Sequence, residues 1–357
     1  MFLHNHVICE DLAELYQRKI KWEKLMGKTI LITGANGMIA SYMVFMCIYL
    51  NESQHYNIKL ILNIRSYEKI RKRLGKYIDK DYIKLCEQDI NKAIILEEDI
   101  NFIIHGASLA SSQYYDSIPI EVILPNVCGT IQLLKLAEKN NLEGFLMFSS
   151  GEIYGKVDSA VRVITEESMG TSNTLDLKNC YCESKRMAEM LCYAWFRQKE
   201  IPVKLARICH TYGPTMDIVN DKRVFASFVH NIVNNHNIVL NSDGSARRPF
   251  CYIADAVAGL FQILLEGIAG EAYNMCNSDE HLSILELAQT LVDMYPQKNL
   301  QIELPQKNQI TSSQRQNESQ GIVSNEKLKM LGWNCKYNTK SGFYRTIESI
   351  QQQELKI

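Results

Sequence analysis

The sequence predicts an α/β protein with a doubly wound parallel sheet and a small C-terminal α/β lobe, and three observations lead to this. Short apolar runs alternate with helix-length segments from about residue 28 to residue 210, as in strands joined by crossover helices. A glycine turn follows the first run, and the pattern changes after residues 212–214. The 357 residues also exceed the ~250–300 at which a single core stops growing, so a second lobe is expected.

The alternation sets the order of the elements. Each apolar run has the length of a buried strand, and each following segment has helical periodicity. Helices between parallel strands cover both faces of the sheet. The predicted strands are 28–34, 59–65, 100–108, 144–150 and 203–209, and the predicted helices are 37–51, 66–78, 125–141 and 181–198.

Composition narrows the function classes. Lys plus Arg is 39 and Asp plus Glu is 40, so the basic excess typical of nucleic-acid binding is missing. Eleven scattered cysteines form no zinc-type cluster, which favours buried thiols in a reducing cytoplasm and predicts no metal site. No uninterrupted apolar run reaches the ~18 residues that span a bilayer, and no signal peptide is recognised. We therefore expect a cytoplasmic protein without a nucleic-acid or membrane partner.

The first predicted strand leads into Thr-Gly-Ala-Asn-Gly-Met-Ile-Ala at 33–40. Gly34 and Gly37 would let the backbone approach a pyrophosphate, and the following helix N-terminus would stabilise its charge. The spacing is G-x-x-G-x-x-A rather than G-x-G-x-x-G, so an ordinary tight turn is the alternative interpretation. Placement directly after the first strand favours a Rossmann-type dinucleotide site.

The end of the second strand bears on the form of the cofactor. An acidic residue there would bind the ribose of NAD, but the sequence reads Asn63-Ile64-Arg65-Ser66. Arg65 and Ser66 could instead bind a 2′-phosphate, which favours NADP, whereas a solvated basic helix is the alternative. NAD and NADP both remain open. Asp89 and Ile90, at the end of a third apolar stretch, could contact adenine.

These elements divide the chain into three parts. Residues 1–27 form a helical extension with Leu12, Leu15, Tyr16 and Ile20 at helical spacing. Residues 28–214 form the dinucleotide-binding domain, to which 250–267 returns. Residues 215–357 form mainly the substrate lobe, and their segment 305–321 is loop-like. Ligands bind outside the carboxyl ends of such sheets, so the cleft is expected between lobe and sheet.

A candidate catalytic set follows the fourth strand. Tyr181 and Lys185 stand four residues apart on a helix and so share a face. A nearby ammonium and an oxidised nicotinamide both favour tyrosinate, so Tyr181 could accept a hydroxyl proton. Ser150 ends the preceding strand and could hydrogen-bond the same substrate oxygen. Taken alone, a Tyr-x-x-x-Lys pair is commonly a surface pair.

These motifs resemble the extended short-chain dehydrogenase/reductases, specifically their nucleotide-sugar epimerase/dehydratase branch. The resemblance runs from Lys28 to about Thr346. Besides the motifs above, it rests on HGAS (105–108), FSSGEIYG (148–155), YCESK (181–185), ARICHTYGP (206–214), DGSARRPFCYIAD (243–255) and LGW (331–333).

The resemblance implies a tightly bound NAD or NADP and a nucleoside-diphosphate sugar substrate. It implies catalytic roles for Ser150, Glu152, Tyr181 and Lys185. The implied cofactor-binding residues, including those argued above, are Gly34, Asn36, Gly37, Met38, Ile39, Arg65, Ser66, Asp89, Ile90, Ala107, Ser108, Tyr181 and Lys185. The implied substrate-binding residues are Ser111, Ser150, Gly151, Glu152, His210, Arg223 and Arg248. His210 fits a packed residue equally well.

Within the branch, the sequence looks most like UDP-glucuronate decarboxylase. Glu152 stands where decarboxylases and 4,6-dehydratases carry Glu, but Gly151 replaces the acid that dehydratases place just before it. A sugar epimerase or a 4,6-dehydratase is the alternative in the same class. A Rossmann protein that senses dinucleotide without turnover is the alternative in another class. Family members commonly dimerise through two helices, one of which carries Tyr181, so a homodimer is expected.

Overall fold

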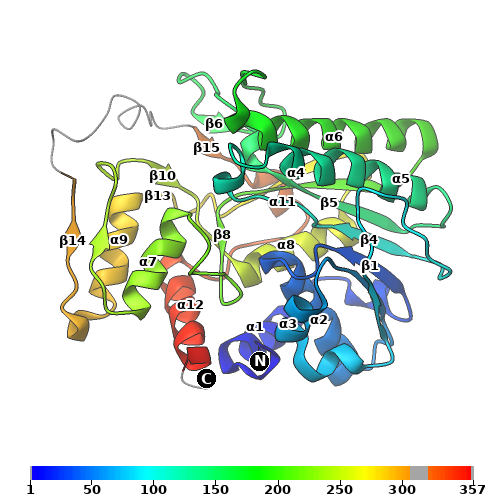
Figure 1. Ribbon diagram of the computed structural model, residues 1–357, viewed down its shortest axis with the longest axis horizontal. Coiled ribbons are helices and arrows are strands. Elements are labelled where there is room, and N and C mark those ends of the chain that lie inside the picture. The colour runs from blue at the N-terminus through cyan, green and yellow to red at the C-terminus, as the bar shows by residue number, and fades with distance from the viewer. Residues whose placement is uncertain (1, 306–320, 355–357) are drawn as a thin grey trace.

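In the computed structural model, which describes residues 2–305 and 321–354, seven parallel strands form the central sheet (Figure 1). Their spatial order is β12-β7-β5-β4-β1-β2-β3. The order reverses direction between β1 and β4, which is where a doubly wound sheet binds its ligand. The strands are β1 (Thr29–Thr33), β2 (Lys59–Asn63), β3 (Ile83–Cys86), β4 (Phe102–His105), β5 (Gly144–Ser150), β7 (Val203–Ile208) and β12 (Ala272–Met275).

The predicted fold class is confirmed, together with the five strands the sequence indicates. The sequence did not predict β3 and β12 as strands. Both have four residues and occupy the two edges of the sheet. A short edge strand is buried less completely than a central one, so it lacks the long apolar run that identified the others.

Alternating side chains place the core on both faces of the sheet. On β1, Ile30 and Ile32 pack into one cluster with α2 (Met38–Gln54) and α8 (Ile253–Glu266), whereas Leu31 packs into another with α5 (Thr130–Ala137) and α6 (Cys180–Lys199). All three β1 side chains are buried. The predicted return of residues 250–267 to the sheet corresponds to α8. A further helix, α3 (Tyr67–Leu74), follows β2.

One helical stretch exceeds what the sequence predicted. The segments α4 (Pro119–Leu124), η5 (Pro125–Gly129) and α5 run on as 19 residues from Pro119 to Ala137, with mean hydropathy 1.4. By length and composition alone this stretch could cross a membrane, although the sequence was expected to contain no segment of that length. Half of this stretch is buried within the protein. The core helix of a globular domain would show the same burial.

The N-terminal extension is helical over a shorter range than the periodicity indicated. Helix α1 (His6–Tyr16) ends at Tyr16, and Ile20 lies beyond it, still buried. Asn5 caps the helix by accepting the Ile8 amide. Residues 2–27 thus lie against the domain, beside the C-terminal helix α12 (Thr339–Glu354) (Figure 1).

The C-terminal lobe is built from helices and two-residue strands. Helix α7 (Val224–Val233) packs on α9 (Ile284–Asp293) and on α12. The strand pairs in and around it are β9 (Ile238–Val239) with β14 (Ile302–Glu303), β10 (Arg247–Arg248) with β13 (Leu282–Ser283), and β8 (Thr211–Tyr212) with β11 (Cys251–Tyr252). Most of the predicted loop 305–321 lies outside the described residues. Directly after it, β15 (Ile322–Val323) pairs with β6 (Val163–Ile164), and α11 (Glu326–Lys329) follows.

Candidate active site

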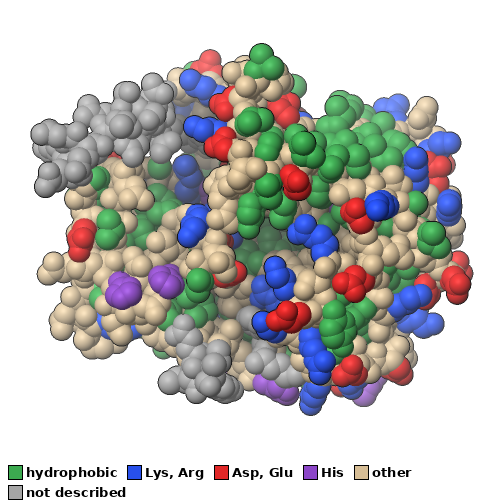
Figure 2. Space-filling model, in the orientation of Figure 1, with side chains coloured by type: hydrophobic (Ala, Val, Ile, Leu, Met, Phe, Trp, Pro, Cys, Tyr) green, Lys and Arg blue, Asp and Glu red, His purple; other side chains and the backbone are tan. Residues whose placement is uncertain are grey.

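A cleft of about 1460 Å³ lies between the carboxyl ends of the central strands and the lobe. Its walls come from β5, β7, the start of α2, the start of α6 and the lobe segments around α7 and β10. Figure 2 shows this face hollowed near its middle, with Lys and Arg side chains around the hollow. Since a drug-sized ligand fills ~300–1,000 Å³, the cleft has room for two ligands side by side.

The structure brings thirteen of the predicted site residues together in this cleft. They are Gly37, Met38, Ile39, Ser108, Ser111, Ser150, Gly151, Glu152, Tyr181, Lys185, His210, Arg223 and Arg248. The others lie behind or beside its walls. They are Gly34, Asn36, Arg65, Ser66, Asp89, Ile90 and Ala107.

The candidate catalytic set meets where β5 ends and α6 begins. Ser150 is the last residue of β5, and its hydroxyl accepts the Glu152 amide at 3.2 Å. Tyr181 and Lys185 lie on successive turns of α6, and the Lys185 ammonium is 5.7 Å from the centre of the Tyr181 ring. Lys185 also donates to the Phe148 carbonyl of β5 at 2.6 Å, which fixes the helix against the strand.

Burial controls the ionisation of this pair. It raises the pKa of Tyr181 to about 12, and a hydrogen bond with Ser150 partly opposes this. Burial also lowers the pKa of Lys185 to about 7. Tyr181 therefore needs a further positive charge beside it before it becomes a base near neutral pH. A bound oxidised nicotinamide would supply that charge.

The glycine turn at the start of α2 fits a dinucleotide. Gly34 has φ +66°, and a Cβ there would lie 2.7 Å from the Gly106 carbonyl, so only glycine allows β1 and β4 to approach this closely. Gly37 is the N-cap of α2 and brings no side chain over the first turn. The Oδ1 of Asn36 is buried without a hydrogen-bond partner. The backbone amides in the first turn of α2 and the unpaired Oδ1 of Asn36 together suit a pyrophosphate and its ribose.

The end of β2 lies beside this turn. The Nδ2 of Asn36 donates to the Ser66 carbonyl at 3.4 Å, while the Ser66 hydroxyl caps α3 by accepting the Lys69 amide. Asn63 does not face the cleft, because its amide donates to the Gln88 carbonyl at 2.9 Å. Arg65 is exposed, which leaves its guanidinium available to a ligand at this corner.

Three of the predicted cofactor residues are not among those that line the cleft. The Asp89 carboxylate is exposed and accepts the Asn91 amide at 3.0 Å. The side chain of Ile90 is buried against Gly129. The Ala107 amide donates to the Thr33 hydroxyl at 3.2 Å, so Ala107 shapes the turn after β4 through its backbone.

Gly151 is enclosed from behind. A Cβ at this position would lie 2.5 Å from the Sγ of Cys209, so any side chain at 151 would require the thiol to move. Cys209 is buried and also lines the cleft. The place of the dehydratase acid is therefore filled by a thiol. The neighbouring Glu152 is exposed to the cleft.

The lobe side of the cleft is positively charged. Arg223 forms an ion pair with Asp221. The guanidinium of Arg248 donates to the Arg247 carbonyl. The negative charge of Glu152 favours the charged form of Arg248. Burial and the charge of Arg248 lower the pKa of His210 to about 3, so His210 is neutral. This wall suits an anionic ligand. His210 also contacts Phe250 edge-on at 6.2 Å, so it is both packed and exposed to the cleft.

Sequence reasoning missed the buried network beneath the catalytic strand. Ser149 donates to Glu189 at 2.5 Å, and Arg207 clamps the same carboxylate through two nitrogens at 3.0 and 2.8 Å. Arg207 also donates to the Tyr154 hydroxyl at 3.1 Å. The network ties β5, α6 and β7 together. One indication of this network is present in the sequence. Glu189 and Arg207 are charged residues within otherwise largely apolar segments.

Two residues of the cleft were also missed. Tyr115 stacks on Tyr181 with 5.5 Å between ring centres and 11° between ring planes. His281 lines the same wall of the cleft, and burial together with the charges of Arg247 and Arg248 lowers its pKa. Both stand in loops whose course the sequence did not reveal. Within the described ranges, no group of three or more His, Cys, Asp or Glu side chains could hold a metal ion.

Fold and cleft define a dinucleotide-binding enzyme with a Ser/Tyr/Lys set at the strand ends. Comparison with known families gives its assignment. A family model described as the NAD dependent epimerase/dehydratase family matches residues 30–276. The chain belongs to this family.

Two curated relatives cover most of the chain. It is 31% identical to UDP-glucuronic acid decarboxylase 6 of Arabidopsis thaliana, over 88% of this chain and 86% of that protein. It is 28% identical to UDP-glucuronic acid decarboxylase 1 of Danio rerio, over 91% and 73%. The chain is thus similar over most of its length to decarboxylases of UDP-glucuronic acid.

Solved structures share the fold. UDP-glucuronic acid 4-epimerase from Bacillus cereus in complex with NAD superposes with a TM-score of 0.73 at 20% identity, covering 91% of this chain and 97% of that one. WbmF from Bordetella bronchiseptica with NAD+ and UDP gives 0.74 at 18% identity, covering 94% and 95%. These matches show that the fold is shared.

Proposed function

We propose that the protein oxidises a nucleoside-diphosphate sugar at C4 and decarboxylates it, with UDP-glucuronate as the substrate. The observation that carries this is the meeting of Ser150, Tyr181 and Lys185 in a cleft whose opposite wall is cationic. The similarity to decarboxylases of UDP-glucuronic acid over 88% of the chain supports the choice of substrate.

The chain's own residues would carry the proton transfers. Tyr181 takes the proton of the sugar 4-hydroxyl, Ser150 hydrogen-bonds the same oxygen, and Lys185 holds positive charge beside the tyrosinate. A bound dinucleotide would supply the oxidation of the sugar at C4 and the later reduction. The resulting 4-ketone makes the C5 carboxylate a β-keto acid, which loses CO2. Gly34, Gly37 and Asn36 would hold the dinucleotide.

The cationic wall would hold the charges of the substrate. We assign Arg223 and Arg248 to the diphosphate or the sugar carboxylate, since the described residues give Arg248 no ion pair. Glu152 faces the same space and would guide protonation at C5 after CO2 has left. Because Gly151 replaces the dehydratase acid and Cys209 fills the space behind it, elimination of water from the sugar is disfavoured.

The test is incubation of the purified protein with UDP-glucuronate and NAD+, following CO2 and UDP-pentose together. Decarboxylation releases equal amounts of both. A UDP-uronate epimer without CO2 would establish the 4-epimerase alternative instead. The matched control is Tyr181→Phe, for which we expect at least ~100-fold lower turnover, as for removal of a general base. Unchanged turnover in that variant would show that Tyr181 is not the base. Dinucleotide binding by a wild type without any turnover would favour a protein that binds dinucleotide without catalysis.

The form of the cofactor is a separate proposal. NAD(H) is the form bound by the family's solved members, but in this chain the end of β2 presents exposed Arg65 and no acid. We propose that Arg65 allows NADP(H) to bind as well. Titration with each dinucleotide tests this: Arg65→Ala should weaken NADP+ binding at least ~5-fold and leave NAD+ binding nearly unchanged. Equal losses for both would refute a 2′-phosphate contact.

We also propose a cytoplasmic protein with a tightly held cofactor that forms a homodimer. Its eleven cysteines, all within the described ranges, are free, which fits a reducing compartment. Denaturing the purified protein and identifying the released dinucleotide by mass tests the tight binding. Exposed apolar residues on α4 and α6 support the dimer and are considered below.

A further inference from the structure

A tyrosine from outside the catalytic set covers the catalytic tyrosine. Tyr115 lies after β4, in the loop that also carries Ser111, and its ring is nearly parallel to that of Tyr181. The ring centres are 5.5 Å apart, within the range of favourable aromatic pairs. Tyr115 therefore occupies one face of the ring whose hydroxyl would take the substrate proton.

Two further contacts fix Tyr115 itself. Its hydroxyl donates to the Ala110 carbonyl at 3.2 Å, which closes the loop on itself. Its own carbonyl lies 3.9 Å from the thiol of Cys180, the residue before Tyr181 at the start of α6. The loop is thus tied to the first turn of α6 through both ring and backbone. This turn has no side-chain cap from Asn179, so it gains its order from such neighbours.

Resting on the proposed function, we infer that Tyr115 is a positioning residue for the reaction. Its stacked ring holds the Tyr181 ring in the orientation for proton transfer and keeps water off that face. A reacting atom misplaced by ~1 Å can lower the rate ~100-fold, so a ring that fixes Tyr181 has a kinetic role without touching the substrate.

The surroundings of Tyr181 indicate how the Tyr115 ring would affect the pKa of Tyr181. Burial is the main cause of its raised pKa. Glu152 raises the pKa further, whereas Arg223 opposes it, and Lys185 lies 5.7 Å from the ring. Tyr115 faces the ring from the opposite element. If its ring is removed, water reaches Tyr181, and the Tyr181 hydroxyl should lose its proton at a lower pH.

The test compares three variants by two measurements. For Tyr115→Ala we expect the pH-independent kcat to fall at least ~10-fold and the acid limb of the kcat profile to move to lower pH. Tyr115→Phe keeps the ring and should stay within about fivefold of the wild type, the size of one lost hydrogen bond. Tyr344→Ala removes an exposed tyrosine of α12 and should change neither quantity.

The second measurement does not need turnover. The tyrosinate absorbance of each protein minus that of its Tyr181→Phe partner gives the titration of Tyr181, even if UDP-glucuronate is not the substrate. A shift to lower pH in Tyr115→Ala, reversed in Tyr115→Phe, supports the proposal. An unshifted titration, or an unchanged kcat plateau in Tyr115→Ala, overturns it.

Discussion

At the residue scale, the chemistry depends on close contacts between side chains far apart in sequence. Tyr181 gains its environment from Ser150 on one strand and from Tyr115 on a loop. Gly151 is limited by Cys209, which directly follows strand β7. Two predictions follow from contacts of this kind.

The first concerns the space behind Gly151. We expect Gly151→Ala to lower the free energy of unfolding by about 1–3 kcal/mol, the usual cost of overpacking, because its Cβ would meet the Cys209 thiol. Adding Cys209→Ala should restore most of the loss. Urea unfolding of both single variants and the double variant measures this coupling. If the changes in unfolding free energy of the two single variants add up in the double variant, the Cys209 thiol moves aside without an energetic cost.

The second concerns Lys185 and pH. Burial lowers the pKa of Lys185 to about 7, against ~10.4 in an unfolded chain. Between these values the unfolded chain binds more protons, so stability rises with pH. From pH 7 to pH 8.5 we expect the unfolding free energy of the nucleotide-free wild type to gain on the order of 1 kcal/mol more than that of Lys185→Met.

Urea unfolding at the two pH values measures this difference. Lys204, whose pKa burial also lowers to about 8, contributes equally in both proteins and cancels from the comparison. Parallel pH dependences would mean that Lys185 remains charged in the folded protein.

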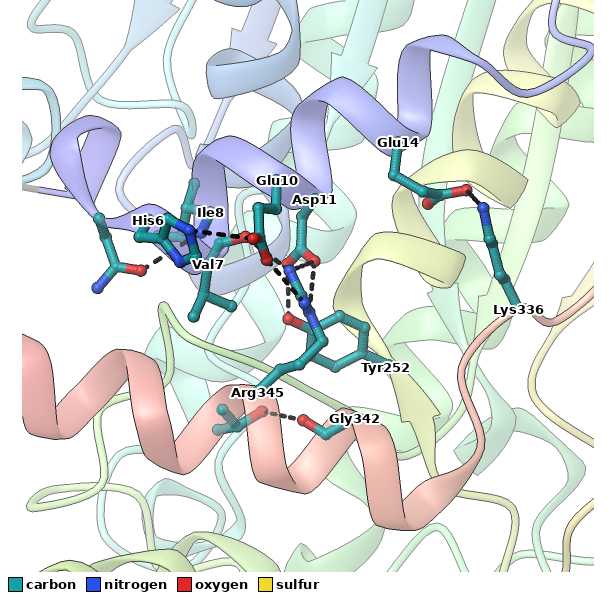
Figure 3. Close-up of polar contacts among 12 residues, drawn as sticks. His6, Val7, Ile8, Glu10, Asp11, Glu14, Tyr252, Lys336, Gly342 and Arg345 are labelled. Atoms are coloured by element: carbon teal, nitrogen blue, oxygen red, sulfur yellow. Dashed lines mark hydrogen bonds and ion pairs between the residues drawn. The ribbon is translucent and has the colours of Figure 1, made fainter.

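At the element scale, the N-terminal helix is held by buried charge (Figure 3). Asp11 of α1 accepts the Tyr252 hydroxyl at 2.6 Å and pairs with Arg345 of α12 at 2.7 Å. Asp11 also accepts the Tyr42 hydroxyl at 2.5 Å. Asp11 is fully buried. One carboxylate thereby joins α1, α2, the strand β11 and α12, and these elements place the lobe beside the sheet.

This arrangement predicts a large difference between two adjacent acids on α1. Asp11→Ala leaves Arg345 half-buried without its main partner and should cost about 3–5 kcal/mol of unfolding free energy. Glu10→Ala is the matched control, since Glu10 pairs with the same arginine at 3.0 Å but is 47% exposed, and it should cost at most ~1 kcal/mol. Denaturant unfolding compares them, and equal losses would contradict the assigned role of burial.

The same scale shows how far periodicity predicts an element. Strand β5 begins and ends where its apolar run does, because a central parallel strand is buried on both faces. Helix α1 stops at Tyr16, short of the predicted range, because apolar spacing continues through a turn whose Ile20 is buried without being helical. A buried apolar residue therefore does not have to be helical, because a loop can also pack on the core.

At the scale of the whole molecule, one patch of the surface is apolar. Hydrophobic side chains gather over α4, α5 and α6 (Figure 2). The exposed ones on α4 and α6 are Ile120, Leu124, Met187, Met190 and Tyr193. Helices α4 and α6 pack against each other, so these side chains form one surface. We propose a second copy of the chain as the partner of this surface.

The proposed dimer gives the last prediction. Met190→Glu places a charge within this surface and should raise the dimer dissociation constant at least ~30-fold, the effect of losing a central contact of about 2 kcal/mol. Met330→Glu alters an exposed methionine directly after α11, which packs on β12, and should leave the dissociation constant unchanged. Light scattering over a concentration series measures both, and a monomeric wild type would contradict the proposal.

The sequence by itself determined five of the seven strands of the sheet, their crossover helices and many residues of the cleft, because burial of parallel strands and the needs of a pyrophosphate leave local patterns in the chain. Gly37, Ser150, Tyr181 and Lys185 could be named because each stands at the end of a strand or the start of a helix. Only the tertiary structure decided that Tyr115 covers Tyr181, that Cys209 closes the space behind Gly151 and that Asp11 holds four elements. Such contacts join residues that are distant in sequence, and their spacing carries no periodicity that could reveal them.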